Sequence, residues 1–254
     1  MPLAARFRRF DTFIFDLDGT VWYWTKAVRS AADVFKALER EGKKYFFITN
    51  NTCLRLEGYA KKLKQFGIAA SAKMIFNPTL AAIKLFRYKR IFCIGENGLK
   101  YELKKSGIML TNKRCDAVLI GDDRTLTYSK MERAVYLASQ GAKLYKTAEG
   151  GKWIMGDIFT LGAGAIAHAI EFCTGKKAEL IGKPTRHMAS VIPKLNGETI
   201  FFGDEHKSDI VFGKKLGFAT CLVLTGIDRK HNIKHIPQPF KPDYVIKGIW
   251  EILG

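Results

Sequence analysis

Two patterns of apolar and polar positions occur along the chain: short continuous apolar runs, and apolar residues spaced as on one face of a helix. Four short runs have the length of a strand and carry mainly apolar residues at successive positions; they are 12–15, 45–48, 200–202 and 219–224. Elsewhere apolar residues recur at the spacing of one helix face, as in Val28, Ala31, Phe35 and Leu38, then Leu56, Tyr59, Leu63 and Phe66, and again around 210–216. Strands without strict alternation are buried on both faces, so the pattern predicts a parallel sheet with helices on both sides.

Residues typical of helix ends flank the first two predicted helices. Ser30 and Asp33 have the spacing of a capping box, which predicts a helix start at Ser30. Gly42 and Gly67 follow the last apolar residues of the two helices, as expected where a helix ends. These signals bound one helix between the first two strands and a second helix after them.

The middle of the chain also shows predicted strands alternating with predicted helices. Strands are predicted at 90–94, 117–120 and 143–145, and helices near 97–106, 128–139 and 163–173. We interpret residues 71–79 as a connector into this region and 174–184 as the return from it. The sequence therefore predicts an α/β protein with a doubly wound, Rossmann-like parallel-sheet core, formed by 1–77 and 182–254, and an inserted α/β cap domain at 78–181.

Composition narrows the class of partners without identifying one. The chain has 42 basic and 24 acidic residues, and its formal net charge of +18 attracts polyanions such as nucleic acid, anionic membranes or phosphorylated metabolites. A basic surface with no specific partner explains the charge equally well. Pairs of basic residues are dispersed along the chain, which argues against a dedicated nucleic-acid segment.

The sequence carries no signal for export, membrane insertion or a disulfide framework. Its five cysteines are odd in number and include no CxxC pair, so neither a disulfide framework nor a zinc site is indicated. No apolar segment typical of a signal peptide precedes Asp11, and no apolar run approaches the length of a membrane span. We expect a cytoplasmic protein with no membrane partner.

Polar side chains follow the predicted core strands. Asp16 follows the first strand, Thr49 the second, and Asp204 the strand near the C-terminal end of the chain. In a parallel sheet the carboxyl ends of the strands lie at one edge, where ligands bind, so topology alone brings these residues together. Asp16 and Asp18 are two positions apart in an extended segment and would point to the same side, with Gly19 allowing the chain to turn.

This grouping of carboxylates indicates a metal and a phosphate. Converging carboxylates stay ionised at neutral pH only beside a positive charge, and Mg²⁺, which prefers oxygen ligands, is the natural candidate. Lys183 and Thr49 would then supply a cation and a hydroxyl, which suit a phosphate better than a carbonyl. An aspartate is also a competent covalent nucleophile toward phosphoryl groups.

Four motifs, in this order, resemble those of the haloacid dehalogenase superfamily of phosphatases. They are "DLDGT" (16–20), "ITNN" (48–51), "IGKP" (181–184) and "GDEHKSD" (203–209). The large insertion between the second and third motifs resembles that of p-nitrophenyl phosphatases, phosphoglycolate and pyridoxal phosphatases, and NagD-like nucleotidases. The resemblance covers essentially the whole chain, because further similar stretches are "GAGAIAHAIE" (162–171), "VLTGID" (223–228) and "KPDYVI" (241–246).

The resemblance implies a Mg²⁺-dependent phosphatase acting on a small phosphorylated metabolite, with a role for each matched residue. Asp16 would attack phosphorus and form an aspartyl-phosphate. Asp18 would protonate the leaving oxygen and then activate the hydrolytic water. The remaining roles would be phosphate binding by Thr49, Asn50 and Lys183, and Mg²⁺ binding by the Asp16 carboxylate, the Asp18 backbone carbonyl and Asp204, with Asp209 in support. A homodimer formed through the cap is a further expectation.

Two departures from the family pattern mean that the substrate is not carried over from any relative. Glu205 and His206 follow the Gly-Asp of the fourth motif, where related nucleotidases often have Arg or Asn. The cap has "KTAEGG" (146–151) where a sequence like Asn-x-Asp is common. We expect specificity to lie in loops near 147–152.

Two other functions remain open. One is a metal-independent dehalogenase, although that chemistry would not require Asp18. The other is a basic nucleic-acid-binding protein on an inactive enzyme fold, which a steep dependence of binding on salt would identify.

Some smaller features each allow two interpretations. "IGDDR" (120–124) is interpreted as a turn, with a cap or substrate contact as the alternative. The glycines of "LGAG" (161–164) favour close helix packing over phosphate binding. Cys53, with no histidine nearby in sequence, is interpreted as structural. His231 and His235 are four positions apart, but no helical pattern surrounds them, so no metal site is predicted there.

Overall fold

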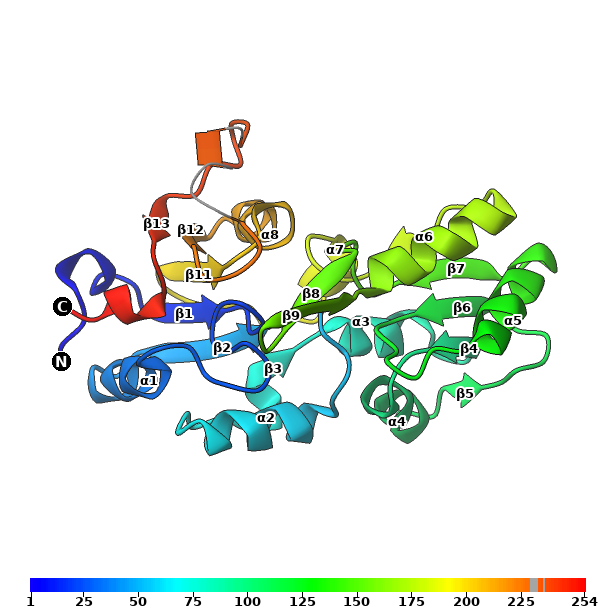
Figure 1. Ribbon diagram of the computed structural model, residues 1–254. Coiled ribbons are helices and arrows are strands. Elements are labelled where there is room, and N and C mark those ends of the chain that lie inside the picture. The colour runs from blue at the N-terminus through cyan, green and yellow to red at the C-terminus, as the bar shows by residue number, and fades with distance from the viewer. Residues whose placement is uncertain (229–232, 235) are drawn as a thin grey trace.

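A computed structural model describes residues 1–228, 233–234 and 236–254, and it contains two parallel sheets arranged end to end (Figure 1). The larger sheet has six strands in the order β13-β12-β11-β1-β2-β3, and every neighbouring pair is parallel. Its strands are β1 (Thr12–Phe15), β2 (Lys44–Ile48), β3 (Ile75–Phe76), β11 (Thr199–Gly203), β12 (Ala219–Val223) and β13 (Tyr244–Ile246). The predicted α/β fold with a parallel-sheet core is confirmed.

Both faces of the larger sheet are buried, as the continuous apolar strands predicted. On one face Phe13, Phe15 and Phe202 stack together, and Phe35 of α1 packs against Phe15 with ring centroids 4.9 Å apart. On the other face Phe201 packs against helix α8. Successive strand residues point to opposite faces, so a strand without polar positions supplies both layers. The helices linked to this sheet are α1 (Ala31–Arg40), α2 (Leu56–Gln65), α7 (Arg186–Ala189) and α8 (Val211–Lys215), with short 3₁₀ helices at Ala5–Phe7, Ala72–Met74 and Ile249–Ile252.

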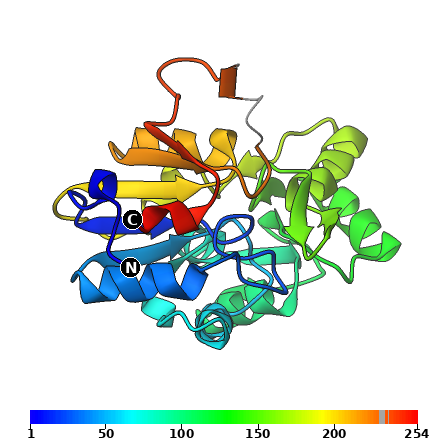
Figure 2. The ribbon, with the colours of Figure 1, turned by 60° about the vertical axis from the view of Figure 1, so that its left-hand side comes forward.

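The smaller sheet has five parallel strands in the order β10-β7-β6-β4-β5. Its carboxyl edge faces the carboxyl edge of the larger sheet, as the opposed arrows of β1 and β6 show in Figure 1. An antiparallel hairpin, β8–β9, extends from it toward the larger sheet (Figures 1 and 2). The elements of this part are β4 (Arg90–Ile94), β5 (Met109–Leu110), β6 (Ala117–Ile120), β7 (Lys143–Lys146), β8 (Lys152–Met155), β9 (Ile158–Leu161), β10 (Glu179–Leu180), α3 (Pro78–Leu85), α4 (Asn97–Lys105), α5 (Tyr128–Ser139) and α6 (Ala163–Thr174).

Most predicted strands and helices lie within one or two residues of their expected bounds, and the misses have physical causes. Strands β3 and β10 fall inside the segments predicted as connectors, because two-residue edge strands are too short to show a pattern. The helix predicted around 210–216 is α8, and a π-helical turn at His206–Ile210, which was not predicted, precedes it directly. The boundaries proposed at 77/78 and 181/182 stay a prediction, although the two sheets take their strands from 12–76 with 199–246 and from 90–180.

The predicted capping box at Ser30 is wrong. Ser30 is the residue before α1, but it has a left-handed backbone with φ of 54°, and its side chain makes no capping hydrogen bond. A capping side chain requires an extended backbone at that position, which the turn after Val28 does not provide. The helix therefore starts where its apolar face begins rather than at a side-chain cap.

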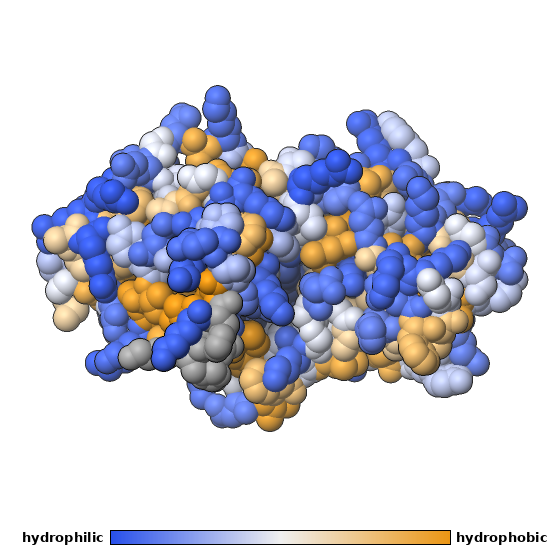
Figure 3. Space-filling model, turned by 90° about the horizontal axis from the view of Figure 1, so that it is seen from above, coloured by the Kyte–Doolittle hydropathy of each residue, from blue (hydrophilic) through white to orange (hydrophobic). Residues whose placement is uncertain are grey.

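In the view from above, hydrophilic residues are spread over both halves of the molecule with hydrophobic patches between them, and the outline is notched between the halves (Figure 3). Within the described residues, no helix combines the length and the apolar character needed to cross a bilayer.

Candidate active site

Three carboxylates meet at the carboxyl edge of the larger sheet. Asp16 follows β1 directly, and Asp204 follows β11, the neighbouring strand. Asp209 lies in the π-helical turn just beyond Asp204. All three are buried, and one carboxylate oxygen from each lies within 4.8 Å of the others. The topology thus brings together acids that are almost 190 residues apart in sequence.

Lys183 holds two of these carboxylates together. Its ammonium donates hydrogen bonds to Asp16 Oδ1 and Asp209 Oδ1, both at 2.6 Å, and to the carbonyl oxygen of Ile48 at 2.8 Å. The residue is only 2% exposed. Burial alone would lower the pKa of Lys183, but the charges of Asp16 and Asp209 outweigh it and hold the pKa above its ordinary value. Lys183 is therefore a permanent cation at the centre of the cluster.

One lysine does not balance three carboxylates. Burial, together with the charge of Asp209, raises the pKa of Asp16, although Lys183 opposes the shift. Burial and the charges of Asp16 and Asp209 raise the pKa of Asp204 as well. This is the physical signature of a site that needs a further positive charge to keep its acids ionised. Oxygen donors at these separations fit a hard divalent cation.

Asp204 is held in place by tight packing against the backbone. The amide of Ile227 donates to Asp204 Oδ2 at 2.7 Å. A Cβ atom at Gly226 would overlap the Asp204 carboxylate, so only glycine fits there. Gly19 has φ of +81° and lies against the same carboxylate, which explains why a glycine follows Asp18.

Asp18 lies outside this trio and is held separately. Its Oδ1 accepts a hydrogen bond from the indole Nε1 of Trp22 at 2.9 Å. Burial raises the pKa of Asp18 to about 6, while the bond from Trp22 acts in the opposite direction. Asp18 lines the same pocket as Asp16, so the two acids share one cavity but have different surroundings.

The polar residues predicted after β2 also reach the pocket. Thr49 is buried, and its hydroxyl oxygen accepts a hydrogen bond from the amide of Asn51 at 3.0 Å. Asn50 Oδ1 accepts from the backbone amide of Lys183 at 2.7 Å and so ties the second motif to the third. Every site residue predicted from the sequence therefore lines this one pocket.

The pocket lies between the two sheets and has a volume of about 610 Å³, part of it open to solvent. The half of the chain that carries the smaller sheet supplies the opposite wall, and its lining residues are Asp122, Ala148, Gly150, Lys152, Trp153, Ile154 and Gly162. Three of these fall in the loops near 147–152, where specificity was expected.

The β8–β9 hairpin is attached to the loop that follows the first motif. Gly156 donates a backbone hydrogen bond to the Tyr23 carbonyl at 2.8 Å, and Lys26 forms an ion pair with Asp157 at 2.8 Å. The Trp24 and Trp153 rings meet edge to face with centroids 5.2 Å apart. These contacts fix one wall of the pocket relative to the catalytic edge.

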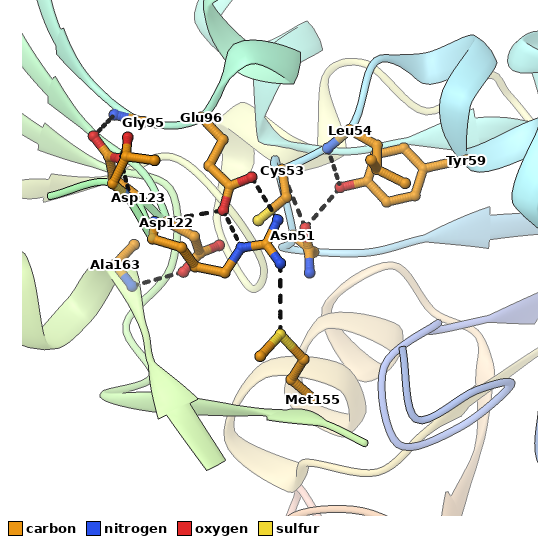
Figure 4. A network of polar contacts seen from close by, with 12 residues as sticks. Asn51, Cys53, Leu54, Tyr59, Gly95, Glu96, Asp122, Asp123, Met155 and Ala163 are labelled. Atoms are coloured by element: carbon orange, nitrogen blue, oxygen red, sulfur yellow. Dashed lines mark hydrogen bonds and ion pairs between the residues drawn. The ribbon is translucent and has the colours of Figure 1, made fainter. Parts of the chain in front are cut away.

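Further polar contacts lie at and beside the pocket (Figure 4). Arg124 forms an ion pair with Glu96 and also contacts the sulfur of Met155 in the hairpin. On the other side, Asn51 Oδ1 accepts hydrogen bonds from Tyr59 and from the Cys53 amide.

Several smaller predictions can now be compared with the structure. The turn at "IGDDR" is also a pocket wall, because Asp122 lines the cavity while Asp123 points away to Lys130. Close packing is confirmed at Gly162 and Gly164, where a Cβ would overlap the backbone of 149–151. Cys53 is buried, and burial raises the pKa of its thiol, as befits a structural residue. His231 and His235 lie outside the described residues.

Sequence reasoning did not assign six of the lining residues to the site: Asn51, Trp153, Ile154, Glu205, Ser208 and Ile227. The hydroxyl of Ser208 donates a hydrogen bond to Glu205 at 2.8 Å. Glu205 carried a signal, since it departs from the family pattern next to Asp204. Trp153 carried none, because only the fold of the hairpin brings it over the site.

Comparisons with known proteins agree with this geometry. A family model described as haloacid dehalogenase-like hydrolase matches residues 13–109, and a second model of the same kind matches 180–252. The 4-nitrophenylphosphatase of Schizosaccharomyces pombe is 29% identical over 95% of this chain and 92% of its own length. The sugar-phosphatase AraL of Bacillus subtilis is 30% identical over 94% of this chain and 90% of its own. A thermostable NPPase double mutant from Geobacillus stearothermophilus superposes with a TM-score of 0.83 at 31% identity, over 97% of this chain and all of the other.

Proposed function

This chain belongs to the haloacid dehalogenase-like hydrolase family, and from that premise we propose that it is a Mg²⁺-dependent phosphatase of a small phosphate monoester. The observation that carries the proposal is the buried trio Asp16, Asp204 and Asp209, two of which, Asp16 and Asp209, are bonded to Lys183. Relatives over nearly the whole chain are named phosphatases, which supports the same activity here.

In the first chemical step, an oxygen of Asp16 attacks phosphorus and the bond to the leaving oxygen breaks. Lys183, Thr49 and the amide group of Asn50 bind phosphoryl oxygens and hold the ester in line with Asp16. Asp18 gives its proton to the leaving oxygen, so the alcohol departs neutral. The products are the free alcohol and an aspartyl-phosphate on Asp16.

In the second step, the Asp18 carboxylate takes a proton from a water molecule, which attacks the same phosphorus atom. Phosphate leaves, Asp16 is restored as a carboxylate, and Asp18 is again protonated for the next ester. Burial keeps the pKa of Asp18 near 6, which suits a group that must both give and accept a proton. Two acids with different surroundings thus carry two roles.

The Asp16 carboxylate, the Asp18 backbone carbonyl and Asp204 would hold Mg²⁺ in this site, with Asp209 in support. When bound, the ion would neutralise the carboxylates and the charge of the phosphoryl group. The wall formed by Asp122 and the hairpin would cover the bound ester and contact its leaving group.

Trapping of the intermediate tests the proposed function. In Asp18→Asn, the first step with an activated leaving group such as p-nitrophenolate should proceed, whereas the second step lacks its base. Rapid acid quench with labelled p-nitrophenyl phosphate should then leave label on Asp16. An equal amount of labelled protein from Asp16→Asn would mean that another residue is the nucleophile.

Trp22 should matter as a positioning residue for Asp18. Replacing Trp22 with Phe keeps a buried ring but removes the 2.9 Å hydrogen bond to Asp18. We expect kcat/KM for n-propyl phosphate to fall by roughly tenfold, since an alkoxide needs the proton, and by less than about threefold for p-nitrophenyl phosphate. Trp250→Phe, at a tryptophan of the 3₁₀ helix Ile249–Ile252 that does not line the pocket, is the matched control. Equal losses on both esters would mean that the hydrogen bond only stabilises the fold.

A further inference from the structure

Asp122 is a buried acid on the wall opposite the catalytic residues. It follows β6, is 3% exposed and lines the same pocket as Asp16 and Asp18. Its Oδ1 accepts a hydrogen bond from the amide of Ala163, the first residue of α6, at 2.9 Å (Figure 4). Among the described residues, no side chain donates a hydrogen bond to this carboxylate. Asp122 therefore has hydrogen-bonding capacity left for a ligand.

One unpaired donor belongs to a residue that lines the same pocket. Within the described residues, the buried indole Nε1 of Trp153 has no hydrogen-bond partner, whereas the buried side-chain nitrogen Nδ2 of Asn51 faces the Asp18 carboxylate. Buried polar groups without partners are costly, so such groups in a binding pocket indicate where polar atoms of a ligand are bound. A hydroxyl both donates and accepts, which matches an acid and an N–H group together.

The charges of the pocket disfavour an anionic leaving group. Beyond the catalytic trio and Asp18, the acids that line it are Asp122 and Glu205. Lys183 is already bonded to Asp16 and Asp209, and Lys152 is exposed, with its ammonium 4.2 Å from the Phe159 ring centroid. A carboxylate on the leaving group would thus meet like charges.

We propose that Asp122 accepts a hydrogen bond from a hydroxyl of the leaving group, so that the pocket selects uncharged, polyhydroxylated phosphate esters over carboxylated ones. This assignment rests on the proposed phosphatase function and adds a specificity-determining residue to it. Asp122 takes no part in the chemical steps at phosphorus.

Three small esters isolate the contribution of the hydroxyls and of charge. Glycerol 3-phosphate and n-propyl phosphate differ in two hydroxyls, and 2-phosphoglycolate carries a carboxylate. We expect Asp122→Ala to lower the ratio of kcat/KM for glycerol 3-phosphate to that for n-propyl phosphate by about tenfold. Asp122→Asn should raise kcat/KM for 2-phosphoglycolate relative to n-propyl phosphate by roughly fivefold, since a like charge is removed. Assays at pH 8 keep Asp122 ionised, because burial raises its pKa to about 7.

The same two substitutions at Glu132, an exposed acid on α5 that does not line the pocket, serve as matched controls and should leave both ratios unchanged. An unchanged glycerol-to-propyl ratio in Asp122→Ala would overturn the assignment. So would an equal loss on all three esters, since Asp122 would then only support the fold. If the wild-type protein hydrolyses neither these esters nor phenyl phosphate, the proposed function itself fails.

Discussion

Replacing Asp16 by asparagine should lower the turnover of p-nitrophenyl phosphate by on the order of 10³ or more, equivalent to roughly 4 kcal/mol of barrier. The substitution removes the nucleophilic oxygen but nearly keeps the shape of the side chain. It also removes one of the two carboxylates that pair with Lys183, whose ammonium lies 2.6 Å from Asp16 Oδ1. Steady-state kinetics on the purified variant would measure the loss.

A matched control separates chemistry from a general loss of charge. Asp33 is an exposed aspartate of α1 on the surface of the same half of the molecule, and Asp33→Asn should keep full activity. Thermal unfolding of Asp16→Asn should show a folded protein, because removing one of several buried like charges offsets part of the lost ion pair. A folded Asp16→Asn variant with activity within about tenfold of wild type would exclude Asp16 as the nucleophile.

Removal of divalent cations should abolish hydrolysis of p-nitrophenyl phosphate altogether. Burial and like charges raise the pKa of both Asp16 and Asp204, so without a cation the acids compete for the single charge of Lys183. Incubation with EDTA followed by an assay in metal-free buffer would show the effect. Adding Mg²⁺ in excess should restore the rate.

A second test of this prediction compares Ca²⁺ with Mg²⁺ in restoring activity. Ca²⁺ should bind but not restore turnover, because it takes more ligands at longer distances and loosens the in-line geometry of attack. Full activity in the presence of chelator would contradict the metal proposal and revive the metal-independent alternative. A rescue by Ca²⁺ equal to that by Mg²⁺ would show that ligand geometry is less strict than we infer.

The sequence by itself determined the larger sheet and the edge at which its polar residues gather. Continuous apolar strands at 12–15, 45–48 and 200–202 imply burial on both faces, and parallel strands place their carboxyl ends together. The sequence alone was therefore enough to place Asp16, Thr49 and Asp204 at one edge of the sheet. These features depend on local patterns and on a general rule of topology, which a single sequence contains.

Only the tertiary structure decided what the opposite wall of the pocket is made of. Asp122 follows a strand of the smaller sheet and looked like a turn residue, and Trp153 lies on a hairpin that no periodicity marked. The amide of Ala163 holds the Asp122 carboxylate, and the place of Trp153 over the site depends on the hairpin contacts with Tyr23 and Trp24, which join segments more than 120 residues apart. Such contacts are stabilised by packing between segments that are far apart in the sequence. Local sequence patterns therefore do not predict them.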